Sequence, residues 1–378
     1  MNFDFSDNEK MFLAQISDTM TAFAKAQDLE SGDLPMIRNH LTDTLAVLAP
    51  LGYLKIGLLK IGAPVSGTLA LMSAMEQLSG ISPSIFLSVE MSTRLFGRIL
   101  RLKEPAEDTH KIVEKLASGE VIGAVALSES AMNVENDPLV TAGIRDGRRI
   151  AVSGAKSYVV NGPVADWFAV VGRLDNQTAV YLIEKKTPGL TLTERIETMG
   201  YNGLAICGLE LDAVMVPESH IVGPIETNRC LDMLKLWENQ ILIAAALGMM
   251  KSSFEAARDY AKTHRSGGKP VIAYQEVGFK LSEMLTLYQT SQLYAYRAAW
   301  MADEDPKEAG VLTLCAKVFC TEAAENIAGK ALQIQSGAGY RSGSAAERAY
   351  RCAKFGQIAG ISTEIARMRI GDAALGRR

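Results

Sequence analysis

Glu238 is the residue of this chain whose setting points most directly to chemistry. It lies in the apolar sequence Leu234–Ile243, and its neighbours at helical spacing (positions 234, 241 and 242) are aliphatic. Such surroundings raise the pKa of a carboxyl group toward neutrality, which suits a general base that removes a proton from an activated C–H bond. The alternative is a glutamate on a helix surface that pairs with Lys235 or with solvent, and the residues alone leave both open.

No common nucleotide-binding fingerprint accompanies this carboxylate. The chain has no Gly-x-Gly-x-x-Gly between a predicted strand and helix, and no phosphate loop that ends in Gly-Lys-Ser/Thr. Ser336–Gly339 is either a helix stop or a place where backbone amides approach a phosphate or a ribityl chain. His264 lies near a predicted helix end, where a cap or a phosphate contact is favoured over a metal ligand. No Cys/His/Asp cluster has metal-ligand spacing, so we expect no metal site.

The bulk composition is typical of a globular protein in water. The 378 residues are 48% hydrophobic and 22% charged, with a formal net charge of −4, which gives no electrostatic signature for binding nucleic acid. Residues 1–9 lack the basic start and apolar run of a signal peptide, and no run of about 18 apolar residues predicts a membrane span. The five scattered cysteines favour a reducing compartment, so we expect a cytoplasmic protein without disulfides.

Hydrophobic periodicity divides the chain into three blocks. Apolar residues recur at three- and four-residue intervals over residues 1–119 and again over 227–378, whereas short β-branched runs separated by turn residues fill 120–226. This order predicts an α+β fold with an N-terminal helical domain, a middle antiparallel β domain and a C-terminal helical bundle. The expected strands lie within Glu120–Leu127, Ile150–Gly154, Trp167–Gly172, Ala179–Ile183 and Gly208–Asp212, and the expected C-terminal helices are Leu231–His264, Gln275–Glu304, Lys307–Gly329 and Thr363–Leu375.

Five segments, taken in order, resemble motifs of the acyl-CoA dehydrogenase family. Leu116–Ser130 is similar to that family's first strand and Thr-Glu-Pro flavin loop, and Lys156–Gly162 to its second flavin loop. The remaining segments are Tyr260–Gln275, Gln333–Tyr340 and the closing signature Ala346–Ile365. The resemblance covers essentially the whole chain and keeps the helix–strand–helix order deduced from periodicity.

The resemblance implies a non-covalent FAD between the β domain and the C-terminal helices. Leu127 and Ser128 would contact the polar edge of the flavin ring, Tyr158 would stack where the family usually has tryptophan, and Val160 replaces a threonine near the ring. His264 aligns with a phosphate-binding arginine and has Arg265 beside it. The positions that would hold the pyrophosphate, ribose and adenine, partly across a subunit boundary of a homotetramer or homodimer, are Gln333, Gly337, Ser362 and Glu364.

Gly360 occupies the position at which many family members carry the catalytic glutamate. The ungapped run from Glu238 to Tyr260 resembles the isovaleryl- and long-chain-like branch, in which the base sits at the position of Glu238. By this resemblance Glu238 would take the α-proton of an acyl thioester while the β-hydrogen leaves as hydride to flavin N5. The Gly360 N–H would bind the thioester carbonyl. We further expect that a carboxylate at either position could approach the α-carbon from the same side.

Several departures from the family pattern concern the thioester arm. Ser130 replaces the flavin-loop proline, Asn133–Glu135 replaces Gly-Ser-Asp, Gly267–Gly268 replaces Phe-Gly, and Asn239 replaces an arginine common in the CoA-specific branch. Trp237 next to the base resembles relatives that act on carrier-protein-bound groups. The acyl carrier is therefore either CoA or a carrier protein, and the electron acceptor an electron-transfer flavoprotein or oxygen. The alternatives are a flavin-dependent oxidase or monooxygenase of the same fold, or a catalytically silent flavin-fold protein.

Overall fold

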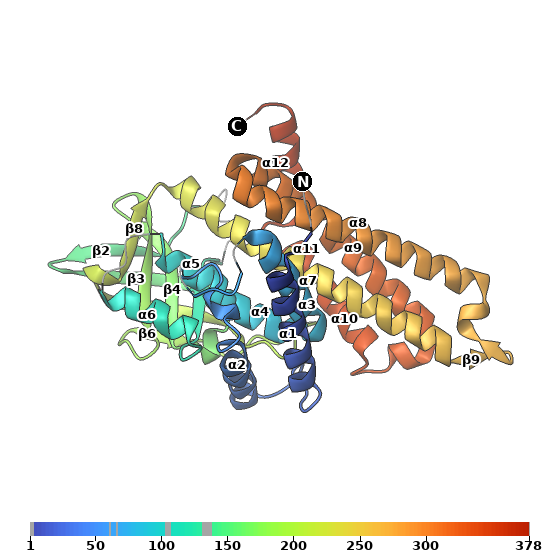
Figure 1. The fold of residues 1–378 in the computed structure, drawn as a ribbon. Coiled ribbons are helices and arrows are strands. Elements are labelled where there is room, and N and C mark those ends of the chain that lie inside the picture. Colours follow the sequence, from blue (N-terminus) through green and yellow to red (C-terminus); the bar gives the residue numbers. More distant parts are fainter. Residues whose placement is uncertain (1–3, 60–61, 66, 103–106, 131–137, 378) are drawn as a thin grey trace.

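A β-sheet forms one end of the molecule, and three long helices extend away from it to the other end, with the N-terminal helices packed between (Figure 1). The computed structural model describes residues 4–59, 62–65, 67–102, 107–130 and 138–377. Helices, then strands, then helices follow one another along the chain, which confirms the predicted α+β fold.

The N-terminal block consists of helices whose starts are encoded locally. Ser6 and Glu9 form a reciprocal capping box, and Asp33 accepts from the backbone N–H of Met36. The block comprises α1 (Asp7–Ala24), α2 (Leu34–Leu48), η1 (Tyr53–Lys55), α3 (Thr68–Ile81), α4 (Pro83–Glu90), η2 (Met91–Phe96), α5 (Gly97–Leu100) and α6 (Glu107–Ala117). The stretch η2 is π-helical, and the side chain of Arg94 is buried there against the backbone carbonyl of Tyr53.

The middle block folds into one eight-stranded sheet in the order β6-β7-β3-β2-β4-β5-β8, with β1 paired to β4. Its strands are β1 (Gly123–Ala126), β2 (Ala142–Asp146), β3 (Arg149–Val160), β4 (Trp167–Leu174), β5 (Gln177–Glu184), β6 (Leu190–Leu192), β7 (Ile206–Pro217) and β8 (Ile221–Ile225). Most ladders are antiparallel, as predicted. However, β1 runs parallel to β4, and β2 meets β4 in parallel at one residue pair, because alternation along a strand does not report its direction.

The C-terminal block contains the longest helices. They are α7 (Thr227–Thr263), α8 (Gln275–Glu304) and α9 (Pro306–Tyr340), followed by α10 (Ala345–Ala353), α11 (Phe355–Ile358) and α12 (Thr363–Ala374). The hairpin β9 (Arg265–Ser266) and β10 (Lys269–Pro270) turns the chain between α7 and α8, where the glycines predicted a helix break. Helix α9 extends past the predicted end at Gly329, and its break is at Ser336, whose φ of 52° lies in the left-handed region.

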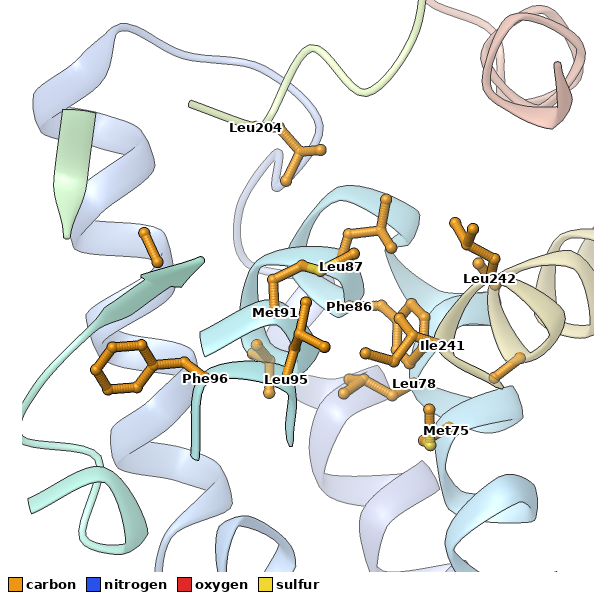
Figure 2. Close-up of a cluster of buried hydrophobic side chains, with 14 of the residues drawn as sticks. Met75, Leu78, Phe86, Leu87, Met91, Leu95, Phe96, Leu204, Ile241 and Leu242 are labelled. Carbon is orange, nitrogen blue, oxygen red and sulfur yellow. The ribbon is translucent and has the colours of Figure 1, made fainter. Parts of the chain in front are cut away.

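Helix α7 is held against α3 by an unusually close crossing. A Cβ on Gly248 would lie 2.0 Å from Ser79 Oγ and 2.3 Å from the Gly80 nitrogen, so only glycine allows this approach. Ser79 Oγ also donates to the Ala244 carbonyl at 2.8 Å. Beside the crossing, apolar side chains of α3, α4, η2 and α7 pack together, among them Met75, Leu95 and Ile241 (Figure 2). This cluster fixes the part of α7 that carries Glu238.

The cysteines do not pair. Cys207, Cys230, Cys320 and Cys352 are buried and Cys315 is partly buried, and all five are free thiols, as predicted. Burial raises the pKa of Cys320 to about 12, so its thiol is unreactive at neutral pH.

Candidate active site

A cavity of about 100 Å³ opens between the β-sheet, η2 and α7. It brings together six residues singled out from the sequence, which come from four separate segments of the chain: Leu127, Ser128, Tyr158, Val160, Glu238 and Gly360. The remaining walls are Met91, Leu95, Val125, Ser157, Leu234 and Lys235. Two of these residues, Met91 and Leu95, come from η2, a segment that the sequence motifs did not single out.

The sheet presents Tyr158 to this cavity through a bulge. The pairing of β3 with β7 shifts register between Lys156 and Val159, and Tyr158 adopts a φ of 55° within that shift. Its ring is consequently 52% exposed. Ser157 donates its N–H to the Ser128 carbonyl at 2.9 Å, which ties the two predicted flavin loops to each other.

A buried ion pair anchors the first of these loops. Lys156 Nζ donates to Glu129 Oε1 at 2.7 Å and to the Leu127 carbonyl at 3.0 Å. The Glu129 carboxylate also accepts from the backbone N–H groups of Val140 and Thr141, at 2.6 and 2.9 Å. These contacts, with the hydrogen bond from Lys156, keep the pKa of Glu129 below its usual value despite its burial. The pair sits directly behind Leu127 and Ser128 and holds their backbone in place.

Glu238 faces the cavity from the middle of α7. Burial raises the pKa of its carboxyl to about 6, and the charges of Lys317 and Lys235 limit this rise. The carboxylate is thus mostly ionised at neutral pH, yet basic enough to accept a proton. Within the described residues no hydrogen bond or ion pair holds its oxygens, which is unlike a surface glutamate paired with Lys235.

Gly360 lies beside Glu238, in a left-handed turn between α11 and α12 with a φ of 67°, and a Cβ at this position would be 3.6 Å from Glu238 Cγ. Among the described residues, nothing accepts a hydrogen bond from its backbone N–H, and the residue itself is exposed at the cavity. A Cβ at this position would lie 2.7 Å from Asn239 Oδ1 and 3.1 Å from Leu242 Cδ1. A side chain at 360 would therefore have to displace Asn239 in a strained backbone conformation, although the position adjoins Glu238; whether a carboxylate at 360 could replace the one at 238 stays a prediction.

Two polar side chains, one from α7 and one from α9, hold this turn. Asn239 Oδ1 accepts from the Ile361 N–H at 3.4 Å, and the Lys317 ammonium donates to the Ile361 carbonyl. Both side chains are almost fully buried, at 1% and 0% exposure. Motif comparison missed Lys317, although a signal existed: it is the only charged residue in the apolar run 310–320.

A larger cavity of about 330 Å³ lies on the other side of the turn, between α7, α9 and α12. Lys235 borders both cavities, so the two adjoin. Asn239 Nδ2 and Thr313 Oγ1 belong to residues that line the larger cavity, and both atoms are buried without a hydrogen-bond partner. Buried polar atoms are normally satisfied, so these two stand out, although neither atom is itself exposed to the cavity.

The space beyond η2 is almost filled. Between α3, α5 and α7 only about 10 Å³ remains, room for about one water molecule. Arg98 closes it by donating to Gln240 Oε1 at 3.2 Å and by lying 5.7 Å from the centre of the Trp237 ring. Among the described residues, this narrow space is what lies between Trp237 and α3.

The other residues suggested by the resemblance lie outside the cavity. Ser362 caps α12 through a hydrogen bond from the Ile365 N–H, and Glu364 is exposed in its first turn. The remaining four, His264, Arg265, Gln333 and Gly337, are exposed near the far ends of α7 and α9. The 26 residues of α7 between Glu238 and His264 correspond to roughly 40 Å of helix. One flavin dinucleotide cannot bridge that distance, so these four residues and the cavity of the same chain cannot share a single cofactor.

Within a single chain, His264 and Arg265 contact only residues close to them in sequence. The His264 ring stacks on Tyr260 at 4.6 Å, and Arg265 donates to the Gly268 carbonyl at 2.6 Å. The departures at Asn133–Glu135 lie outside the described residues. Over the described ranges no helix has the length and apolar character needed to cross a membrane, and no three His, Cys, Asp or Glu residues are grouped to hold a metal.

Comparison with known proteins identifies the family. The acyl-CoA dehydrogenase middle-domain model matches residues 124–214, and the C-terminal-domain model matches 233–375. The chain is 31% identical to isovaleryl-CoA dehydrogenase of Arabidopsis thaliana over 79% of this chain and 74% of that protein. It is 28% identical to benzylmalonyl-CoA dehydrogenase of Aromatoleum aromaticum over 98% of each. Its fold matches the prolyl acyl carrier protein oxidase AnaB with a TM-score of 0.85, at 23% identity, over 98% of this chain and 100% of AnaB.

The chain therefore belongs to the acyl-CoA dehydrogenase family, and it is an FAD-dependent flavoprotein oxidoreductase that acts on acyl thioesters. The types of the residues that line the cavity suit this cofactor. Tyr158 leaves an aromatic ring uncovered, and Ser128 and Ser157 place hydroxyl groups beside it, as a planar ring with a polar edge requires. The flavin ring would lie against Tyr158, Leu127 and Ser128, with Glu238 on the opposite wall.

Proposed function

We propose that this chain catalyses α,β-dehydrogenation of an acyl thioester with Glu238 as the general base. The observation that carries the proposal is the Glu238 carboxyl itself, which faces the cavity opposite Tyr158 and has a pKa of about 6. FAD, when bound, supplies the acceptor for the β-hydride. The protein aligns the Cα–Cβ bond between Glu238 and the Tyr158 wall and removes the α-proton.

The Gly360 N–H is the group we assign to the thioester carbonyl. It points to no acceptor among the described residues, and the side-chain-free turn lets a carbonyl oxygen approach it closely. Removal of the α-proton moves negative charge onto that oxygen, so a fixed N–H donor stabilises the transition state more than the ground state. Glu238 and Gly360 thus divide the work: one takes the proton and the other stabilises the enolate.

The adjoining 330 Å³ cavity is where we place the arm that carries the acyl group. Its unpartnered Asn239 Nδ2 and Thr313 Oγ1 suit an amide-containing arm. A phosphopantetheine arm is common to CoA and to carrier proteins, so these groups serve both. Its rim carries an ion pair between Arg369 and Asp232, at 3.1 Å.

Anaerobic bleaching of the bound flavin by a panel of acyl thioesters tests the reaction. Wild-type protein should lose its flavin absorbance within a turnover, and Glu238→Gln should bind flavin but bleach about 10²- to 10⁴-fold more slowly. Glu283→Gln, which removes an exposed carboxylate from α8, is the matched control and should behave as wild type. Near wild-type bleaching by Glu238→Gln would show that another residue is the base. Steady oxygen consumption by reduced flavin without any thioester would instead indicate a monooxygenase.

The identity of the acyl carrier can be determined by offering the enzyme one acyl group on two different carriers. The same acyl group on CoA and on a phosphopantetheinylated carrier protein should both bleach the flavin if only the arm is recognised. A strong preference for one carrier identifies the substrate, and the electron acceptor follows from reoxidation by an electron-transfer flavoprotein or by oxygen.

We propose that the active form is a homotetramer or homodimer in which one subunit completes the flavin site of another. The roughly 40 Å along α7 between Glu238 and His264 supports this arrangement. So do the exposed apolar side chains Phe279, Leu285 and Leu293 on α8, which a partner would cover. Sedimentation should give an oligomer with about one FAD per chain, and a monomer with full flavin occupancy would contradict the arrangement.

A further inference from the structure

Lys317 is the most deeply buried cation near the proposed base. It lies on α9, it has 0% exposure, and its ammonium donates to the carbonyl of Ile361 in the turn after Gly360. A neutral donor could satisfy a single carbonyl without the desolvation cost of burying a charge. A lysine at this place therefore needs a reason beyond one hydrogen bond.

The charges around Lys317 supply that reason. Burial lowers the pKa of Lys317 to about 8, while the carboxylates of Glu238 on α7, Glu364 on α12 and Glu322 on α9 raise it in part. Its ammonium is consequently still protonated at neutral pH. Glu322 is already paired with Arg367 at 2.6 Å, and Glu364 is exposed, so Glu238 is the carboxylate in the protein interior.

The turn that Lys317 holds lies beside Glu238, since a Cβ at 360 would be 3.6 Å from Glu238 Cγ, and two lysine charges act on this carboxyl. Lys317 acts from α9 and Lys235 from the same helix as Glu238, and both lower the pKa of its carboxyl against the effect of burial. Only Lys317 also holds the turn that carries the Gly360 N–H. One side chain thus contacts the element that binds the carbonyl and acts electrostatically on the group that takes the proton.

We propose that Lys317 is a positioning residue of this active site. It fixes the Gly360–Ile361 turn through the Ile361 carbonyl, and it keeps the Glu238 carboxylate ionised in its apolar surroundings. The inference rests on the proposed function, since it assigns to Lys317 a role exerted through Glu238 and Gly360. It adds a third functional group that lies outside the substrate cavity.

The pH dependence separates this role from a purely structural one. The Lys317 cation favours the charged form of Glu238, so its removal raises the pKa of that carboxyl. The acid limb of the bleaching rate in Lys317→Met should then move to higher pH by about one unit, the lower end of what a nearby opposite charge produces. The rate at the plateau should also fall, because the Ile361 carbonyl loses its donor. Lys330→Met, which removes a lysine from α9 at its ion pair with Glu283, is the control and should leave the acid limb in place.

A second measurement does not depend on turnover. The ionisation of Glu238 can be followed in flavin-free protein as the protonated-carboxyl infrared band that Glu238→Gln lacks. Its midpoint should rise in Lys317→Met in step with the acid limb. If Lys317→Met does not fold, Lys317→Gln keeps an amide donor without the charge, and the same upward shift is expected.

An acid limb and an infrared midpoint that coincide with those of the wild type, in whichever Lys317 variant folds, would overturn the proposal. This result would leave the proposed function intact, because Glu238→Gln tests that function separately. Conversely, if no thioester bleaches the wild-type flavin, the proposed function fails, while the infrared titration still tests whether Lys317 controls Glu238.

Discussion

Replacement of Gly360 by alanine tests whether the turn is as constrained as its geometry implies. The residue has a φ of 67°, and an alanine held in the left-handed region costs roughly 1–2 kcal/mol. The new Cβ would also lie 2.7 Å from Asn239 Oδ1, a contact shorter than side chains tolerate. Asn239 must then move and give up its hydrogen bond from the Ile361 N–H, which adds about 1 kcal/mol. We therefore expect Gly360→Ala to lower the free energy of unfolding by about 2–3 kcal/mol.

A double variant separates the two contributions. In an Asn239→Ala background the contact with Asn239 is absent, and Gly360→Ala should cost mainly the backbone part, about 1–2 kcal/mol. The coupling between the two sites should thus be about 1 kcal/mol. Gly278→Ala is the control, because Gly278 lies within α8 without a positive φ or any neighbour within 4 Å, so the substitution should not destabilise the protein.

Chemical denaturation of the wild type, the two single variants, the double variant and the Gly278→Ala control, with flavin-bleaching rates measured in parallel, supplies the test. The Gly360→Ala enzyme should bleach more slowly, by up to about 10²-fold, because its displaced N–H no longer meets the thioester carbonyl. The same geometry predicts that Gly360→Glu does not restore activity to Glu238→Gln. Wild-type stability together with a wild-type bleaching rate in Gly360→Ala would refute the reasoning.

Three further outcomes follow from the site. Lys156→Met leaves the Glu129 carboxylate buried without its cation, so it should lower stability by about 3–5 kcal/mol and weaken FAD binding; unchanged thermal unfolding and FAD affinity would contradict this. The wild-type bleaching rate should fall about tenfold per pH unit below about pH 6, because the pKa of Glu238 is raised to about 6 and only its ionised form accepts a proton; a flat rate down to pH 5 would exclude Glu238. Trp237→Ala should enlarge the nearly filled space beside Arg98 and improve bleaching by longer acyl thioesters relative to short ones; an unchanged chain-length profile would show that the acyl group does not enter there.

The sequence predicted the fold class and the position of Glu238 for reasons that are local. Helical spacing places residues 234, 241 and 242 beside Glu238 whatever the tertiary contacts are. The predicted ends of α8, Gln275 and Glu304, coincide with those in the structure, since the break before it and Asp305–Pro306 after it are both encoded in neighbouring residues. Burial of the carboxyl then follows from the apolar neighbours.

The missed features depend on contacts between distant segments. The bulge that exposes Tyr158 arises from a register shift against β7, about 50 residues along the chain, and no property of 156–160 alone predicts it. Likewise, the role of Lys317 depends on its hydrogen bond from α9 to the Ile361 carbonyl, which sequence alone does not reveal. The distant group around His264 and Gln333 was predicted from motif resemblance, partly across a subunit boundary, and the length of α7 shows how far this group lies from the cavity of its own chain.

A base on α7 is supported by a different element from the N–H that would bind the carbonyl, whereas a base on the turn would share that element. Glu238 belongs to a 37-residue helix that α3 and α9 pack against, so its carboxyl has a rigid support. The turn at Gly360, relieved of any side chain, can bring its N–H close to a carbonyl, and Asn239 fills the space that a Cβ would need. The proposed base and the Gly360 N–H thus belong to separate elements of the fold. Substitutions at 360 should therefore impair binding of the thioester carbonyl while leaving the proton acceptor in place.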